Sequence, residues 1–142
     1  MRLAVLAGLL AGLYACVTPP APPEVQATHF GPVPPAPSLE QLARAERVRN
    51  WIWSARPRAD DYAWLYPRNA WFAEVEAQVV LNCIAQSDGG VACVAKDDGM
   101  PQYDFEQAAR NLSTRFRLAP LTRDGVPIVG KRLVVSISFR LN

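Results

Sequence analysis

The chain has 142 residues, of which 50% are apolar and 20% are charged, enough apolar material for one modest core. Its formal net charge of +2 creates no strong field toward polyanions. This composition argues against two large domains and against nucleic acid as a partner.

The first fifteen residues have the pattern of a signal peptide. Arg2 precedes an apolar stretch from Leu3 to Leu13, about half of the ~20 residues that a spanning helix needs. The stretch ends in Leu13-Tyr14-Ala15-Cys16, which resembles the cleavage box of bacterial lipoproteins. The resemblance implies cleavage before Cys16, lipidation of its thiol, and a periplasmic location at the outer membrane. An ordinary cleaved signal and a retained short anchor are the alternatives.

Residues 16–37 are predicted to form a lipid-anchored tether. Eight of the 13 prolines lie between positions 17 and 37. Proline fixes φ and removes a donor, so an extended polyproline-like chain is expected. At about 3.1 Å per residue, the 21 residues after Cys16 reach at most roughly 65 Å. The only histidine, His29, lies in this tether.

Residues 38–65 are predicted to form a helical extension. Ser38 and Gln41 form a capping-box pattern, and five apolar residues follow at helical spacing toward Ala55. They are Leu39, Leu42, Ala45, Val48 and Ile52. Tryptophans at 51, 53, 64 and 71 favour either core packing or an exposed aromatic groove for a ligand or peptide.

The next segment predicts a β-hairpin. "EAQVVLNCIA" alternates, "SDGG" turns the chain, and "VACVAK" returns it. A turn at 87–89 places Cys83 directly opposite Cys93, with Cα atoms about 4.5 to 5.5 Å apart. A disulfide fits that separation and implies an oxidising compartment. Two reduced buried thiols are the alternative, and no further ligands lie near for a metal.

A helix and a last strand complete the fold. Asp104 is a plausible N-cap for an amphipathic helix with one apolar stripe, formed by Phe105, Ala108, Ala109, Leu112 and Phe116. "KRLVVSISFRLN" then alternates, with Leu133, Val135, Ile137, Phe139 and Leu141 inward. The expected class is α+β, a small antiparallel sheet in β-β-α-β order with one helix on a face.

Residues 66–142 resemble the C-terminal domain of the TonB family. The resemblance rests on an ordered set of short pieces: Tyr66-Pro67 with Ala70, the strand ending in Cys83, the Asp88-Gly89 turn, Phe105 with Ala108-Ala109, Phe116-Arg117 with Pro120, Asp124-Gly125 leading to Pro127 and Gly130, and Phe139-Arg140. A branch of the family carries paired cysteines on the same two strands. The resemblance implies a domain that binds a short extended segment of an outer-membrane transporter by adding it to the sheet.

The expected binding edge is the last strand, at Leu133, Val135, Ile137, Phe139 and Arg140. An edge strand exposes unpaired N–H and C=O groups that a partner strand satisfies. Its arginines either hold a carboxylate of the partner or only prevent aggregation.

The predicted function is protein binding without catalysis, cofactor or metal. Residues 38–142 contain no histidine for a Ser-His or Cys-His pair, and Asp97-Asp98 before Gly99 is typical of a turn. A lipid-anchored periplasmic module that binds a transporter or envelope protein is therefore expected. The alternatives are an energy transducer whose retained anchor couples to an inner-membrane motor, and a structural envelope lipoprotein.

Overall fold

The computed structural model describes residues 31–96 and 99–141. The predicted signal peptide, Cys16, His29, most of the tether and the Asp97-Asp98 turn lie outside these residues. Among the helices that are described, none combines the length and the apolar character needed to cross a bilayer.

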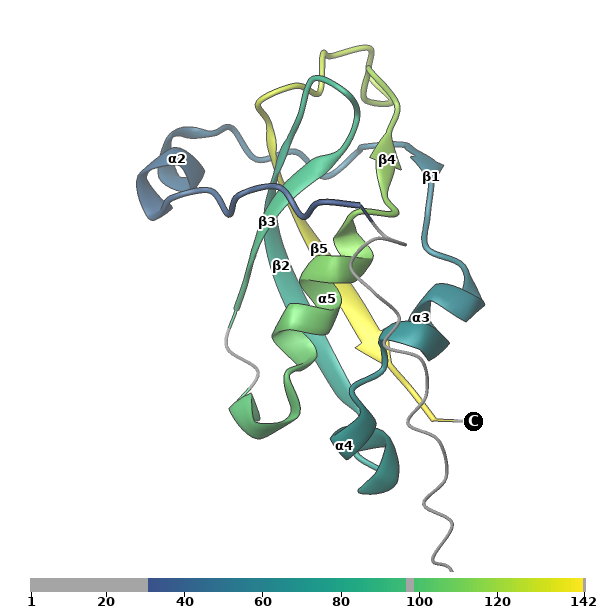
Figure 1. The fold of residues 1–142 in the computed structure, drawn as a ribbon. Coiled ribbons are helices and arrows are strands. Elements are labelled where there is room, and N and C mark those ends of the chain that lie inside the picture. Colours follow the sequence, from purple (N-terminus) through teal and green to yellow (C-terminus); the bar gives the residue numbers. More distant parts are fainter. Residues whose placement is uncertain (1–30, 97–98, 142) are drawn as a thin grey trace, which may run out of the picture.

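A three-stranded antiparallel sheet forms the centre of the fold. Its strands are β2 (Ala77–Ala85), β3 (Val91–Ala95) and β5 (Arg132–Phe139), in the order β3-β2-β5. Helix α5 (Phe105–Ser113) lies across one face of this sheet (Figure 1). The α+β class and the order of two strands, helix and strand are confirmed.

The core lies between α5 and the sheet. Every second residue of β2 is buried, and α5 buries the predicted stripe from Phe105 to Leu112. On β5 the side chains of Leu133, Ile137 and Phe139 are fully buried. The alternation and the helical stripe thus mark the faces that pack together. Helix α5 ends at Ser113, so Phe116 is buried from the loop beyond it.

The hairpin turn requires glycine at position 89. Gly89 has φ +83°, and a Cβ there would lie 2.9 Å from the carbonyl oxygen of Leu118. Its N–H donates to the Gln86 carbonyl, while the Gly90 N–H donates to Asp88 Oδ1 at 2.8 Å. The turn therefore holds β2 and β3 in the predicted register, with Cys83 opposite Cys93.

The N-terminal extension differs from the prediction. The Ser38–Gln41 capping box is present, but helix α2 (Leu39–Arg44) ends eleven residues before Ala55. The chain instead becomes extended, because residues 46–48 pair with the start of β5 and bury Val48. A tertiary pairing has overridden the helical spacing.

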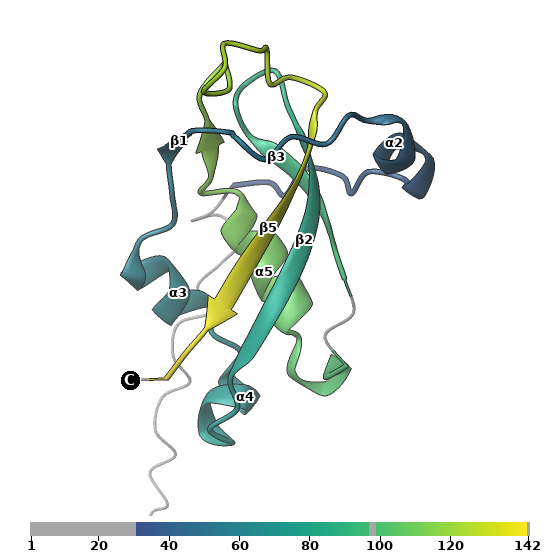
Figure 2. The same ribbon diagram turned by 180° about the vertical axis from the view of Figure 1, so that it is seen from behind.

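The remaining elements are short, and those that belong to the rest of the extension lie on the β5 side of the sheet. Strand β1 (Trp53–Ala55) pairs with β4 (Arg117–Leu118) in a second, two-stranded sheet. Helices α3 (Ala59–Leu65) and α4 (Arg68–Phe72) follow, and the turn η1 (Pro101–Tyr103) precedes α5. Asp104 precedes α5 as predicted, but its side chain forms no cap hydrogen bond. Both views place β1 and α3 beyond β5, on the side away from β3 (Figure 2).

Candidate functional site

The outer edge of β5 alternates between residues whose backbone points to β2 and residues whose backbone points away. The Ala85 N–H donates to the Lys131 carbonyl, so odd-numbered residues of this segment bond to β2. The Arg132 N–H and C=O point outward, where they meet the extension. Because this direction alternates along an antiparallel strand, the backbone groups of Val134, Ser136 and Ser138 also point outward.

The extension covers only the first of these outward positions. The Arg132 N–H donates to the Glu46 carbonyl at 2.8 Å, and the Arg132 carbonyl accepts from the Val48 N–H at 2.9 Å. Within residues 31–96 and 99–141, no backbone partner meets Val134, Ser136 or Ser138 on that side. Three amides and three carbonyls are therefore available along the remaining edge.

A first hollow lies beside the first half of this edge and is called the Trp hollow. Its volume is about 420 Å³. It is lined by Trp51, Trp53, Arg56, Pro57, Tyr62, Phe116, Val134, Val135 and Ser136. Trp53 packs on Phe116 with ring centroids 4.6 Å apart, and Trp51 meets Trp53 edge to face at 5.9 Å. The walls are thus aromatic rings held by the core.

A second hollow, the Tyr hollow, lies beside the other half and has a volume of about 360 Å³. It is lined by Ala59, Tyr62, Ala63, Tyr66, Trp71, Ser138, Phe139 and Arg140. The Tyr66 hydroxyl donates to the Val75 carbonyl. Burial raises the pKa of Tyr62 and of Tyr66, so both phenols remain protonated and neutral at physiological pH.

Each hollow has one charged residue in its lining, and in both it is an arginine, Arg56 or Arg140. Arg140 Nη1 lies 3.3 Å from Glu76 Oε2, with 60% of the arginine side chain still exposed. Glu76 also accepts the Leu141 N–H at 2.8 Å, and this hydrogen bond is the main cause that lowers the pKa of Glu76, with Arg140 adding to it. Each hollow therefore has one guanidinium group in its lining, and that of Arg140 is paired with Glu76.

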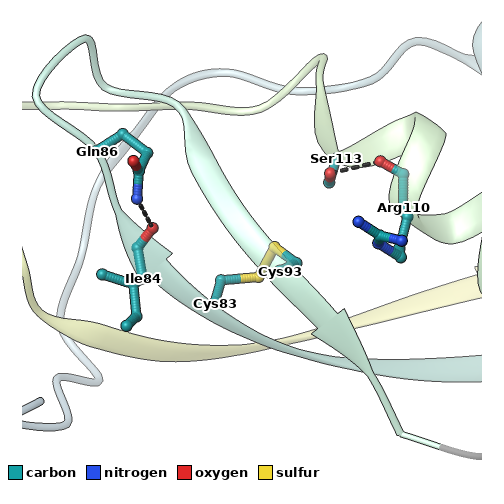
Figure 3. The surroundings of a disulfide bond; sticks show 6 residues. All are labelled: Cys83, Ile84, Gln86, Cys93, Arg110 and Ser113. Atoms are coloured by element: carbon teal, nitrogen blue, oxygen red, sulfur yellow. Dashed lines mark hydrogen bonds between the residues drawn. A yellow bond between two sulfur atoms is a disulfide. The ribbon is translucent and has the colours of Figure 1, made fainter. Parts of the chain in front are cut away.

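The disulfide lies on the other half of the sheet. Cys83 and Cys93 are bonded, with Cα atoms 4.1 Å apart. Figure 3 shows the bond joining β2 to β3, with Arg110 and Ser113 of α5 on the same side of the sheet. Neither cysteine lines either hollow. The bond fixes the hairpin rather than the edge.

The structure shows which parts of the predicted edge residues are accessible. Leu133, Val135, Ile137 and Phe139 lie on the edge strand, but their side chains are buried in the core and their backbone groups face β2. Arg140 follows the strand and is exposed. The outward backbone belongs to the residues between them, because its direction depends on the side on which β2 pairs. Local alternation carries no such information.

The walls of the hollows were predicted only in part. Trp51 and Trp53 pack against the core and line the Trp hollow, whereas Trp64 and Trp71 are 48% and 53% exposed. Packing against the core is therefore confirmed for Trp51 and Trp53, whereas Trp71 lines the Tyr hollow. Tyr62, which lines both hollows, was not anticipated, since nothing local distinguishes it from other residues of a surface helix.

The described residues contain no group of three His, Cys, Asp or Glu side chains placed to hold a metal. Comparison of the chain with protein families, with curated proteins and with solved structures finds no match. The function must therefore be inferred from the geometry of the β5 edge.

Proposed function

We propose that this chain is a lipid-anchored periplasmic module of the TonB C-terminal kind. It recognises an outer-membrane transporter or another envelope protein by adding a strand of that partner to β5. The observation that carries the proposal is the outward backbone of Val134, Ser136 and Ser138, which no described residue occupies. A partner strand would satisfy these groups, at about 0.5 to 1.5 kcal/mol net for each hydrogen bond.

The sequence of β5 supports this use of the edge. Natural sheets usually protect an exposed edge with a charge, a proline or a bulge. Between Arg132 and Arg140 the strand has no charged residue and no proline, and its register with β2 runs without a bulge from Ala77↔Phe139 to Ile84↔Arg132. The exposed side chains of the strand, those of Ser136 and Ser138, are small and polar. No charged residue, proline or bulge of the strand therefore obstructs the backbone of a partner strand.

The anchor and the tether would set where the domain works. Acylated Cys16 fixes one end in the membrane, and the proline-rich residues 17–37 set the reach. With no histidine in residues 38–142, the module acts by binding and holding a segment rather than by catalysis.

Strand addition is tested by site-specific photo-crosslinking of the full-length chain in its own cell envelope. A photo-reactive amino acid at Ser138 should yield a crosslinked partner, whereas the same group at Gln107, exposed on α5, should not. Adding Ser136→Pro removes one outward N–H at a position where an edge strand tolerates proline, so the crosslink should disappear. Equal crosslinking with and without the Ser136→Pro substitution would contradict the proposal.

The anchor is tested separately by mass spectrometry of the mature N-terminus. The expected species begins at Cys16 and carries lipid, and labelled palmitate should no longer enter a Cys16→Ala chain. A mature protein that begins at Met1 in the inner-membrane fraction would instead favour an energy transducer.

A further inference from the structure

The two hollows occupy defined positions relative to a guest strand, the partner segment that would pair with the outer edge of β5. Guest residues opposite Val135, Ile137 and Phe139 place their side chains on the α5 side of the sheet, because paired residues share a face. The Trp hollow includes Val134 to Ser136, so it receives the guest residue opposite Val135. The Tyr hollow includes Ser138 to Arg140, so it receives the residue opposite Phe139. The two receiving positions are four residues apart in the guest.

Tyr62 divides these two positions. It lines both hollows and packs edge to face on Phe139, with ring centroids 6.1 Å apart. Its ring therefore stands next to the guest position between the two hollows, opposite Ile137. A small side chain fits beside the ring at that position, and a bulky one collides with it.

The length of the guest is limited by residues of the chain itself. Glu46 and Val48 already occupy the outward groups of Arg132. At the other end, Arg140 and Leu141 are bonded to Glu76. The free edge between them, positions 134 to 139, accommodates about six residues, or roughly 20 Å of extended chain.

The arginines that line the hollows favour an acidic guest strand. Arg56 and Arg140 are the charged residues in the linings of the two hollows, and Arg56 has no carboxylate partner within the described part of the chain. A guest with a carboxylate beside either apolar side chain would pair with these guanidinium groups.

A second copy of this chain does not fit the hollows. Its β5 would have to present Val135, Ile137 and Phe139 on the α5 side, but these side chains are 0 to 8% exposed in their own core. Pairing of two β5 strands would leave both hollows unfilled.

From these observations we infer that residues 46–63 are the specificity element of the β5 edge. The partner segment is a short acidic strand with two apolar side chains four residues apart and a small residue midway. This inference rests on the proposed strand addition and deepens it, because the extension, rather than the sheet, selects the partner.

The test uses capped seven-residue peptides titrated calorimetrically into the full-length chain in detergent. The parent peptide has glutamate at both ends, leucine at positions 2 and 6, alanine at position 4, and threonine at positions 3 and 5. Replacing either leucine by alanine should weaken binding about tenfold or more, the worth of burying such a side chain. Tyrosine at position 4 should weaken it similarly, and lysine at both ends should weaken it severalfold.

One variant of the chain is expected to bind one of the peptides more tightly, and misfolding could not produce that result. Tyr62→Ala joins the two hollows, so the peptide with central tyrosine should bind this variant more tightly than it binds the unmodified chain. Trp64→Ala removes a half-exposed ring of the same helix that lines neither hollow, and it should leave the affinities of both peptides unchanged.

The outcomes separate the two proposals. A parent peptide that is N-methylated at positions 3 to 5 cannot pair with the edge, and it should not bind. If it binds as well as the parent, strand addition itself fails, and the specificity inference fails with it. If N-methylation abolishes binding but all side-chain variants bind equally, strand addition stands and the specificity inference is overturned. A dimer that Ser136→Pro dissociates would make a second copy the occupant and would also overturn it.

Discussion

Strands β3 and β5 are the two edges of one sheet, and they differ in length, burial and covalent linkage. Strand β3 is five residues long, is buried at Val91, Ala92 and Cys93, and is covalently joined to β2. Pro32 and Pro34 lie in the lining of a hollow with Gly90 and Val91, at its start. Strand β5 is eight residues long and exposes Ser136 and Ser138.

The comparison shows that the fold of this small sheet does not depend on the outward backbone of Val134, Ser136 and Ser138. The disulfide and the tight turn stabilise the β2–β3 half. The β5 half is held by its buried odd-numbered side chains and by its ladder to β2. Neither of these uses the outward backbone of β5, which has no partner beyond Arg132 among residues 31–96 and 99–141.

The largest effect is expected from Phe139→Ala, which removes the largest buried side chain of β5. The Phe139 ring is fully buried and lies 5.3 Å from Phe105 and 5.7 Å from Tyr66, centroid to centroid. Such a truncation costs about 3 to 5 kcal/mol of unfolding free energy, measured by urea denaturation. Phe72→Ala, at a 76% exposed site, should cost less than about 0.5 kcal/mol. Equal costs would show that the ring does not hold β5.

The next effect is expected from removing the disulfide that joins β3 to β2. A chain with Cys83→Ala and Cys93→Ala should lose roughly 2.5 to 3 kcal/mol, because the bond closes a loop between residues ten positions apart. The melting temperature of the unmodified chain should fall in reductant, and that of the variant should not respond. Cys16→Ala is the control and should retain the full response. A variant that melts like the unmodified chain would rule out a stabilising disulfide.

Proline substitution compares the loss of stability at the β5 edge with the loss at β2, the central strand of the sheet. Asn82→Pro, on β2, removes an N–H that faces Val94 and leaves a carbonyl of β3 unsatisfied, at a cost of about 1 to 3 kcal/mol. Ser136→Pro removes an N–H without a partner in the described residues, and it should cost clearly less. Thermal unfolding of both variants measures the difference. If Ser136→Pro were the more destabilising of the two, its N–H would have to be bonded within the chain.

The smallest effect concerns the end of β5 and depends on pH. The lowered pKa of Glu76 means that its charged form is favoured by folding, so its stabilisation is fully present above the ordinary glutamate pKa of 4.5. That stabilisation is lost as the pH falls through the lower folded pKa. The melting temperature of the unmodified chain should therefore exceed that of Glu76→Gln at pH 6, and the gap should close on acidification. A gap that widens in acid would contradict the lowered pKa.

The periodic elements were predictable because their signals are local. Alternation in β2 and β5 and the stripe of α5 follow from which residues face one core. The turn at Gly89 set the register that brings Cys83 opposite Cys93. Each of these signals lies within one segment of about ten residues.

The extension and the site were not predictable in the same way. Val48 occurs at helical spacing, but its position is decided by pairing with Arg132, 84 residues away along the chain. The outward direction of the Ser136 backbone depends on which side of β5 the neighbouring strand lies. The role of Tyr62 arises only where α3 passes beside that strand. All three depend on contacts between distant segments.

The availability of the β5 edge is tested most directly by amide hydrogen exchange of the free chain, resolved residue by residue. The amides of Ser136 and Ser138 should exchange rapidly, whereas those of Ile137, bonded to β2, and of Arg132, bonded to Glu46, should be protected. Uniform protection along β5, with Ser136 as slow as Ile137, would mean that the edge is already occupied and would contradict strand addition.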